Sequence, residues 1–511
     1  MADFIRRLTI SILLIGLIPG FAVATNYEPA NVSPPKPARE FRGAWIATVA
    51  NIDWPSSNAL STAAQKAELS ALLDRAAQLK LNVVIFQVRP ACDALYASEL
   101  EPWSEFLTGA MGKRPEPYYD PLSFAVEEAH RRGLELHAWF NPFRAGHPSA
   151  KSAASENHVS RQHPQWVRHY GKQIWLDPGE KEARDYSLRV VMDVVRRYDI
   201  DGVHFDDYFY PYKELNRAGE EMEFPDEASW KKYGVGRKIS RDDWRRENVD
   251  QFIQGVYNSV KATKPWVKFG VSPFGIWRPG NPPAIKGFDS YEKLYADSKK
   301  WLSKGWVDYF APQLYWAIGS KEQSFPVLLK WWTQQNPKGR LLLPGLDDSK
   351  TSSRRRGPDA LIWPSAELVN QIQIIRKQTG VCGEIHWNLG TLMRNDNLAE
   401  ALLRESYAEP ALPPPYPWID SKTPAKPMLT AGAENHSSGN STGVKATWSF
   451  TGPEKPALWI VQTKAAEWKT QILPGAKTSL EWRGAAPELI AVTAVDRNGN
   501  CSSPSVLRLR R

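Results

Sequence analysis

Between residues 40 and 408, short apolar runs alternate with longer segments in which apolar residues recur every three or four positions. The short runs are rich in β-branched and aromatic residues and indicate strands, whereas the longer segments have the period of helices. The predicted strands cover residues 41–49, 81–90, 134–143, 200–209, 267–277, 307–316, 340–348 and 382–390. Helical patterns between them include residues 62–80, 120–133, 182–199, 242–262 and 365–380.

Eight strand–helix pairs in this order predict an α/β fold, a (β/α)8 TIM barrel with some enlarged loops over residues 40–408. A doubly wound open sheet is the alternative, but none of the predicted strands is followed by a Gly-rich phosphate loop. In a TIM barrel the chemistry lies at the carboxyl ends of the strands. The residues that close each predicted strand are therefore the candidates for function.

The first 24 residues have the pattern of a secretory signal peptide. Arg6 and Arg7 precede an apolar core over residues 8–18, and Ala22-Val23-Ala24 is a small-x-small cleavage site. The apolar core is too short to favour a membrane-spanning helix. We therefore expect a periplasmic or extracellular protein with no stable membrane insertion after cleavage, and an N-terminal linker over residues 25–39. An uncleaved anchor is the alternative.

The C-terminal part of the chain has a different pattern. Residues 409–427 are rich in proline and predict a stiff linker. Residues 428–511 contain short alternating runs separated by Gly, Pro and Asn, which predict a small all-β sandwich. The run VTAVDRNGNCSSPS resembles the last hairpin of fibronectin type III modules. The barrel should therefore be followed by a fibronectin III-like domain.

Composition and charge narrow the class of partner. Only three cysteines occur in 511 residues, too few for a disulfide framework, so the fold must depend on its core. The formal net charge of +9 favours an anionic surface or polymer, such as a cell wall or an acidic glycan, although charge alone does not exclude nucleic acid. The 22 tryptophans are unusually many, so much aromatic surface must be in use. A generic basic secreted protein is the alternative.

The stretch DGVHFDDYFYP, residues 201–211, places two acids side by side at the end of the fourth predicted strand. Alternation along a strand turns Val203 and Phe205 toward the helices, and His204 and Asp206 into the barrel. Asp206 then faces the barrel mouth, and Asp207 begins the following loop. An unpaired charge is costly to bury, so Asp206 needs a partner or a function.

Three interpretations of these acids remain open at this point. Asp206 could form a salt bridge to Arg89 or Arg278, or the two acids could bind a metal with His137 or His204, although no metal-binding spacing such as HExxH supports the latter. The third interpretation is glycoside hydrolysis, which uses a pair of carboxyl groups. The Asp-Gly-x-x-x-Asp pattern resembles the fourth strand of the α-amylase superfamily and, more loosely, that of chitinases. His204 and Tyr208 depart from those two patterns, so neither mechanism transfers intact.

Polar and aromatic residues recur at the ends of the other predicted strands, Ser272 on the fifth and Trp387 on the eighth among them. Sugar rings stack on aromatic side chains, and their hydroxyls bond to amides, carboxylates and guanidinium groups. The predicted substrate-binding residues are Asp53, Trp54, Gln87, Arg89, His137, Trp139, Asn141, Arg144, His204, Tyr208, Arg278, Gln313, Tyr315 and Trp316. Because these residues converge in a barrel, we predict a saccharide groove that needs no metal and no cofactor.

Long blocks of the sequence resemble one known family. REFRGAWIATVANIDWPS, NVVIFQVRPACDALYASELEPWSEFLTG, DGVHFDDYFYP and DYFAPQLYW, among others spread over residues 40–320, are similar to the bacterial glycosyl-hydrolase-like family ten. The resemblance implies a secreted or envelope (β/α)8 hydrolase. Characterised relatives include a divisome-localised lipoprotein that cleaves peptidoglycan glycan strands stripped of their stem peptides. This chain lacks the lipidation cysteine, so the anchoring of that relative does not carry over.

The resemblance directs attention to the acids within the shared blocks. We predict Asp206 as nucleophile or base, and Asp207 as a residue that holds a substrate hydroxyl or tunes the pKa of its neighbour. Asp93 is the first candidate for the general acid, ahead of Asp53 and Glu384. The predicted function is cleavage of glycosidic bonds in peptidoglycan or a related cell-surface polysaccharide. We accordingly predict a glycan polymer as substrate, no nucleic-acid partner, and cell-wall contact through the C-terminal module. The alternatives are a non-catalytic carbohydrate-binding barrel and a metal-dependent deacetylase or phosphoesterase.

Overall fold

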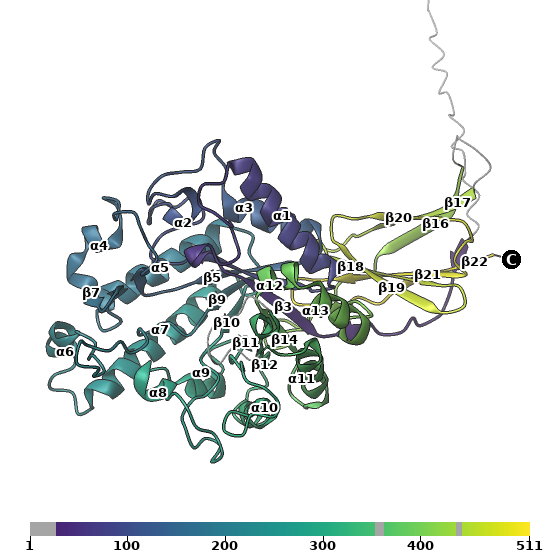
Figure 1. The fold of residues 1–511 in the computed structure, drawn as a ribbon. Helices are drawn as coiled ribbons and strands as arrows, with labels where there is room; N and C mark the ends of the chain where they lie inside the picture. The colour runs from purple at the N-terminus through teal and green to yellow at the C-terminus, as the bar shows by residue number, and fades with distance from the viewer. Residues whose placement is uncertain (1–26, 353–361, 436–441, 511) are drawn as a thin grey trace, which may run out of the picture.

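The computed structural model of the protein describes residues 27–352, 362–435 and 442–510. The predicted signal peptide, residues 1–24, lies outside these ranges. None of the helices in the described ranges has both the length and the apolar character needed to cross a membrane. The chain folds into a barrel and a sandwich that lie end to end (Figure 1).

A curled, all-parallel sheet forms the barrel, as the sequence predicts. Its strands are β3 (Phe41–Ile46), β4 (Val83–Arg89), β5 (Glu135–Phe140), β9 (Gly202–Phe205), β10 (Lys268–Val271), β11 (Tyr309–Phe310), β12 (Leu341–Leu342), β13 (Gly345–Asp347) and β14 (Gly383–Trp387). The short strands β12 and β13 are two pieces of the seventh predicted strand. Because β12 pairs with β11, and β13 pairs with β14, this broken strand closes the barrel.

Helices follow the barrel strands and cover them from outside. They are α1 (Thr62–Gln78), α3 (Pro121–Arg131), α5 (Lys181–Arg197), α7 (Arg241–Thr263), α9 (Ser298–Lys304), α10 (Phe325–Gln334), α11 (Ser365–Lys377), α12 (Leu389–Arg394) and α13 (Asp396–Ala401), which continues into η4 (Leu402–Ser406). Several start at a side-chain cap: Ser61 caps α1, Asp120 caps α3 and Ser240 caps α7. Their apolar faces pack on the outer side of the strands in one large core.

The enlarged loops lie at the carboxyl ends of the strands. Their elements are η1 (Val49–Asn51), α2 (Glu105–Thr108), β6 (Arg144–Gly146), α4 (Val159–Gln162), η2 (Pro164–Trp166), β7 (Val167–Tyr170), β8 (Gln173–Leu176), α6 (Glu227–Tyr233), α8 (Ser290–Lys293) and η3 (Asp348–Thr351). In Figure 1, α4 and α6 stand at the far side of the barrel from the sandwich. The loops therefore build up the mouth of the barrel and leave its other end to the sandwich.

The barrel interior is filled by aromatic rings and glycines. His137 and His204 each lie 2.9 Å from the Tyr309 hydroxyl, measured from Nδ1. A Cβ atom at Gly270 would lie 1.9 Å from the Tyr309 ring, and one at Gly202 would lie 2.5 Å from the His137 ring. Glycine is required at these two positions because the neighbouring ring occupies the space of a side chain.

Seven antiparallel strands form the C-terminal sandwich. They are β16 (Met428–Asn435), β17 (Thr442–Ser449), β18 (Leu458–Lys464), β19 (Trp468–Pro474), β20 (Ser479–Arg483), β21 (Leu489–Val495) and β22 (Ser505–Leu509). One sheet contains β16, β17 and β20, and the other contains β19, β18, β21 and β22. Trp448 and Trp459 lie in the core between them. The sandwich fold agrees with the sequence, and its relation to fibronectin type III modules stays a prediction.

The two segments expected to be linkers pack against the domains. Within residues 25–39, β1 (Tyr27–Pro29) pairs with β22 as an edge strand of the sandwich, and β2 (Ala38–Arg39) pairs with β15 (Ala411–Leu412) of the proline-rich segment. Tyr416 is buried at the floor of the barrel, and the Trp418 indole donates a hydrogen bond to Asp308 over 2.8 Å. Proline content predicted the absence of helix, but it carried no information about this packing.

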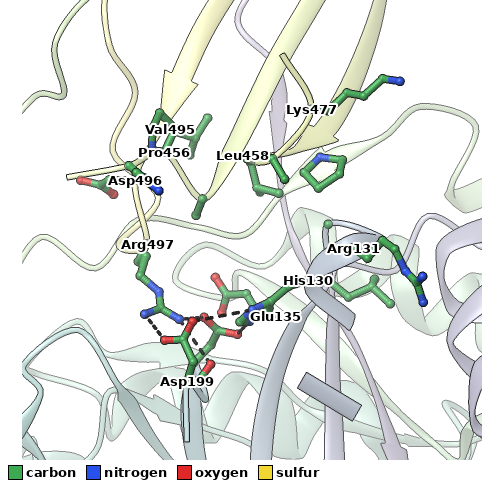
Figure 2. A pocket seen from close by; sticks show the side chains of 18 of the residues that line it. His130, Arg131, Glu135, Asp199, Pro456, Leu458, Lys477, Val495, Asp496 and Arg497 are labelled. Atoms are coloured by element: carbon green, nitrogen blue, oxygen red, sulfur yellow. Dashed lines mark hydrogen bonds and ion pairs between the residues drawn. The ribbon is translucent and has the colours of Figure 1, made fainter. Parts of the chain in front are cut away.

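Arg497 fixes the sandwich to the floor of the barrel, the amino end of its strands. Its guanidinium lies 2.6 Å from Asp199 and 3.2 Å from Asp201, as Figure 2 shows for Asp199. The ammonium of Lys268 donates to the Arg497 carbonyl over 2.7 Å. Burial alone would raise the pKa of Asp201, but His130, Arg497 and Lys268 hold it well below the ordinary value. The charge on Asp201 is therefore compensated from both domains.

We predict that Arg497→Ala lowers the free energy of unfolding by about 2 kcal/mol at neutral pH, because it removes one partner of a buried carboxylate. Urea unfolding of the whole chain measures the effect. Arg510→Ala is the matched control, since Arg510 pairs with Glu28 at the exposed surface and should cost well under about 1 kcal/mol. Equal losses of unfolding free energy in the two variants would contradict a role of Arg497 in attaching the sandwich to the barrel.

Candidate active site

A cavity of about 300 Å³ opens at the carboxyl ends of the barrel strands. Its lining residues come from six of the strands and the loops that follow them: Trp45, Val49, Ile52, Trp139, Arg144, His147, Asp206, Asp207, Tyr208, Tyr212, Ser272, Gln313, Tyr315 and Trp387. Seven of the predicted site residues are among them, namely Trp139, Arg144, Asp206, Asp207, Tyr208, Gln313 and Tyr315. The cavity is therefore the candidate active site, at the end of the barrel where such sites form.

Asp206 follows β9 and points into the cavity, as the alternation along this strand predicts. The side-chain amide of Asn141 donates to both of its carboxylate oxygens over 2.6 and 2.8 Å, and the Trp139 indole donates over 3.1 Å. Burial raises the pKa of Asp206, while Arg144 and these donors oppose the rise. The donors favour the ionised form and hold the Asp206 carboxyl group in a fixed orientation.

Asp207 lies beside Asp206 in the same cavity and differs from it electrostatically. The Tyr212 hydroxyl donates a hydrogen bond to its carboxylate. Burial and the neighbouring charge of Asp206 raise the pKa of Asp207 to about 7, against the effect of Tyr212. Two adjacent buried carboxyl groups do not easily ionise together. Near neutral pH, Asp206 is therefore the charged member of the pair, and Asp207 keeps its proton over part of the range.

Three tryptophans form an aromatic floor beside the acids. The Trp387 ring makes edge contacts with Trp45 and Trp139, both at 6.1 Å between ring centres. Trp45 also donates from its indole nitrogen to His204 over 3.1 Å, which fixes its position. Indole rings at the bottom of a polar cavity offer the apolar faces on which sugar rings stack.

Gln87 and Arg89 hold the site from behind and do not line the cavity. The Gln87 amide donates to Asn141 over 2.6 Å, and its carbonyl oxygen accepts from the backbone of Thr48 and Val49. Arg89 donates to the Asn141 carbonyl over 2.7 Å and is paired with the buried Glu101. Both residues were predicted to bind substrate. Their contacts instead fix Asn141, which is also outside the cavity wall and orients Asp206.

The remaining predicted binding residues lie elsewhere. His137 and His204 are packed inside the barrel below the cavity, bonded to Tyr309. Trp54 is fully buried and donates to a backbone carbonyl of α1, that of Gln65. The structure does not bring these residues to the cavity. Alternation along a strand predicts that His137 and His204 face inward, but it does not predict their depth in the barrel. Trp54 lies beyond the end of β3, where alternation no longer applies.

Arg278 and Trp316 also lie away from the cavity wall. Arg278 pairs with Asp289 and Glu292 in its own loop. Trp316 packs edge-on against Phe274 at 5.6 Å. Both residues lie near the carboxyl end of a strand, as predicted. The loops that follow β10 and β11 direct their side chains toward neighbouring residues and away from the cavity.

The three candidates for the general acid are all outside the cavity. Asp93 is buried under the loop after β4, where it accepts from the Ala91 backbone over 2.8 Å. Asp53 accepts from the Ala47 backbone over 2.8 Å. Glu384 points outward from β14 and accepts from the Tyr407 hydroxyl over 2.5 Å. Burial raises the pKa of Asp93 to about 6 and of the other two to about 7, but none of them faces Asp206 across the cavity.

Several residues of the cavity are not among the predicted substrate-binding residues. Trp45 could have been found, because the alternation applied to residues 201–206 also turns Phe41, Gly43 and Trp45 inward on the first strand. Ser272 directly follows β10 and Trp387 ends β14, and the sequence places both among the polar and aromatic residues at strand ends. Val49, Ile52, His147 and Tyr212 lie in loops, where no periodicity indicates the direction of a side chain. Among the described residues, no group of three or more His, Cys, Asp or Glu side chains could hold a metal ion.

Residues 40–356 match the family model described as Glycosyl hydrolase-like 10. The chain belongs to this family. Glycosyl hydrolase YngK from Bacillus subtilis (strain 168) is 42% identical over 431 residues, which cover 83% of this chain and 82% of YngK. Glycosyl hydrolase DigH from Escherichia coli (strain K12) is 38% identical over 328 residues, 60% of this chain and 73% of DigH. These matches confirm the resemblance seen in the sequence.

Among solved structures, the chain is similar to the PgaB (BpsB) glycoside hydrolase domain from Bordetella bronchiseptica. The TM-score is 0.47 and the sequence identity 12%, over 72% of this chain and 99% of that domain.

We predict that Tyr212→Phe raises the pKa of Asp207 above about 7, because the hydroxyl that this change removes stabilises the ionised carboxylate. Carbon-13 NMR titration of the aspartate carboxyl groups measures this pKa without an activity assay. Tyr208→Phe, in the same loop, is the control and should leave it in place. An unchanged pKa in the Tyr212 variant would show that this hydrogen bond does not set the protonation of the pair.

Proposed function

We propose that this member of the family hydrolyses glycosidic bonds in the glycan strands of peptidoglycan, or of a related cell-surface polysaccharide, outside the cytoplasm. The observation that carries the proposal is the pair of unlike carboxyl groups, Asp206 and Asp207, on an aromatic floor in one cavity. Glycoside hydrolysis needs one carboxyl group that holds a proton and one that is ionised.

The geometry supports a division of roles between the two acids. Asp206 is oriented by Asn141 and Trp139 and serves as nucleophile or base. Asp207 has the higher tendency to stay protonated and donates its proton to the leaving oxygen. This role replaces the expected one of Asp93, which does not reach the cavity. Arg144 lies close enough to lower the pKa of Asp206 and so favours its ionised state.

The choice of an envelope glycan rests on the chemistry of the chain. Its net positive charge favours an anionic polymer, and the N-terminal pattern favours export. The relatives YngK and DigH carry the name glycosyl hydrolase. The sandwich is attached to the end of the barrel opposite the cavity and leaves the mouth open, which supports a separate binding role for it. We propose the glycan as substrate and the wall as the partner of the sandwich.

We predict that Asp206→Asn lowers the rate of cleavage of purified, peptide-free glycan strands by about 10²–10⁴-fold or more, since it removes the ionised carboxylate. Asp207→Asn should lower it within a similar range. Mass spectrometry of the released fragments gives the rate. Asp93→Asn is the matched control, and it should retain most of the activity when its thermal unfolding is unchanged.

The roles of the two acids can be distinguished with substrates whose leaving groups differ in their need for a proton. An aryl glycoside whose phenol leaves without a proton should be cleaved by Asp207→Asn far better than a natural strand, while Asp206→Asn stays inactive on both. Full activity of Asp206→Asn on natural strands would reject its assignment. Binding of strands without cleavage by the unaltered protein, on every wall glycan tried, would favour the carbohydrate-binding alternative.

The pH dependence follows from the same pair. Activity should rise on the acidic side as Asp206 ionises, and fall as the pH rises through about 7, where Asp207 loses its proton. A profile of kcat/KM between pH 4 and pH 9 tests this shape. The fall above pH 7 should be absent in Asp207→Asn. A fall that persists in that variant would assign the proton to another group.

A further inference from the structure

We infer that a second cavity, which adjoins the catalytic one on the side of β14, holds further sugar residues of the same glycan strand. The inference rests on the proposed function and gives it an extended binding site. This cavity has a volume of about 720 Å³, against about 300 Å³ for the catalytic cavity. The smaller volume is at the lower limit for small-ligand sites, so a polymer must continue beyond it.

The two cavities share a wall. Ile52, in the loop after β3, and Trp387, the last residue of β14, line both of them. Trp387 is also part of the aromatic floor, through its contacts with Trp45 and Trp139. A chain of sugar rings that leaves the acids along the Trp387 ring therefore enters the second cavity without crossing a barrier of the fold.

The second cavity has the surface chemistry of a saccharide site. Its polar lining consists largely of hydroxyl and amide side chains, among them Ser349, Thr351, Asn395 and Asn397. Hydroxyl and amide groups both donate and accept, which matches the hydroxyls of a sugar. Two apolar side chains flank them: Ile52 is 43% exposed and Ile362 is 48% exposed. They are among the few large hydrophobic residues that the described chain leaves open to solvent, and they suit the C–H faces of sugar rings.

The wall of the second cavity is held rigidly. The Asn388 side-chain oxygen accepts from the backbone and the hydroxyl of Thr391, which caps α12. The Asn395 amide donates to the Thr351 hydroxyl over 2.8 Å and ties the start of α13 to η3. The one acid of the lining, Asp396, is paired with Arg75 at 2.7 Å. The lining also contains the exposed Arg394, whose guanidinium can donate to sugar oxygens or to a carboxylate of the glycan. The polar face offered to a ligand is thus preorganised and consists mainly of hydroxyl and amide groups, which fits sugar hydroxyls.

Substitution of Asn397 tests the inference, because it is exposed, lines only the second of the two cavities and has no place in the catalytic machinery. Asn397→Trp fills the second cavity. It should lower kcat/KM on long peptide-free glycan strands about tenfold or more, while the shortest oligosaccharide that is cleaved reacts as before. Met393→Trp adds the same ring at an exposed neighbouring position outside the cavity and should change neither substrate.

Binding provides a second measurement that does not need turnover. In the Asp206→Asn background, calorimetry with the same long strands should show about tenfold weaker binding when Asn397→Trp is added, and no change with Met393→Trp. Equal loss on short and long substrates, or equal binding of long strands with and without Asn397→Trp, overturns the inference. Failure of the proposed function appears differently, as absence of cleavage by the unaltered protein, and the binding comparison still decides on the second cavity.

Discussion

The cost of burying two neighbouring carboxyl groups governs the architecture of this protein. Asp206 and Asp207 lie in one small cavity, where both cannot readily ionise together. Asn141 and Trp139 stabilise the charge on Asp206. Gln87 donates to Asn141 and is itself held by the backbone that follows the first strand. The hydrogen-bond network is therefore assembled from the ends of three strands, β4, β5 and β9, that pair side by side in the parallel sheet. The unequal protonation of the acids, and with it the proposed chemistry, depends on this network.

The barrel divides its two ends between different tasks. At the amino end, the ion pair of Arg497 with Asp201 and the hydrogen bond from Lys268 to the Arg497 carbonyl join the sandwich to the barrel. At the carboxyl end, the long loops surround the acids and the tryptophan floor. Strand β1 also begins in the sandwich before the chain enters the barrel, so both ends of the described chain lie in the sandwich, opposite the cavity (Figure 1). Attachment of the sandwich to a polymer would leave the mouth free.

Sequence patterns were reliable where a physical rule acts over a short distance. Alternation along residues 201–206 correctly turned Val203 and Phe205 outward and Asp206 into the mouth, because a strand exposes successive side chains to opposite sides. The same rule did not give depth: His137 and His204 share the inward side with Asp206, yet they pack against Tyr309 inside the barrel. Loop residues such as Tyr212 had no periodic signal, and Asp93 was placed correctly at a strand end but is turned under its own loop.

The sequence by itself determined the order of the elements, the barrel followed by a β-sandwich, the family, and the strand end that carries the acids. These follow from local periodicity and from motifs that need no knowledge of distant contacts. Only the tertiary structure decided which acids share the cavity, which candidates support it from behind, and that the supposed linkers pack against both domains. Those outcomes depend on which side chains from strands far apart in sequence come into contact, and on how deeply each side chain is buried. A local sequence pattern predicts neither the contacts nor the burial.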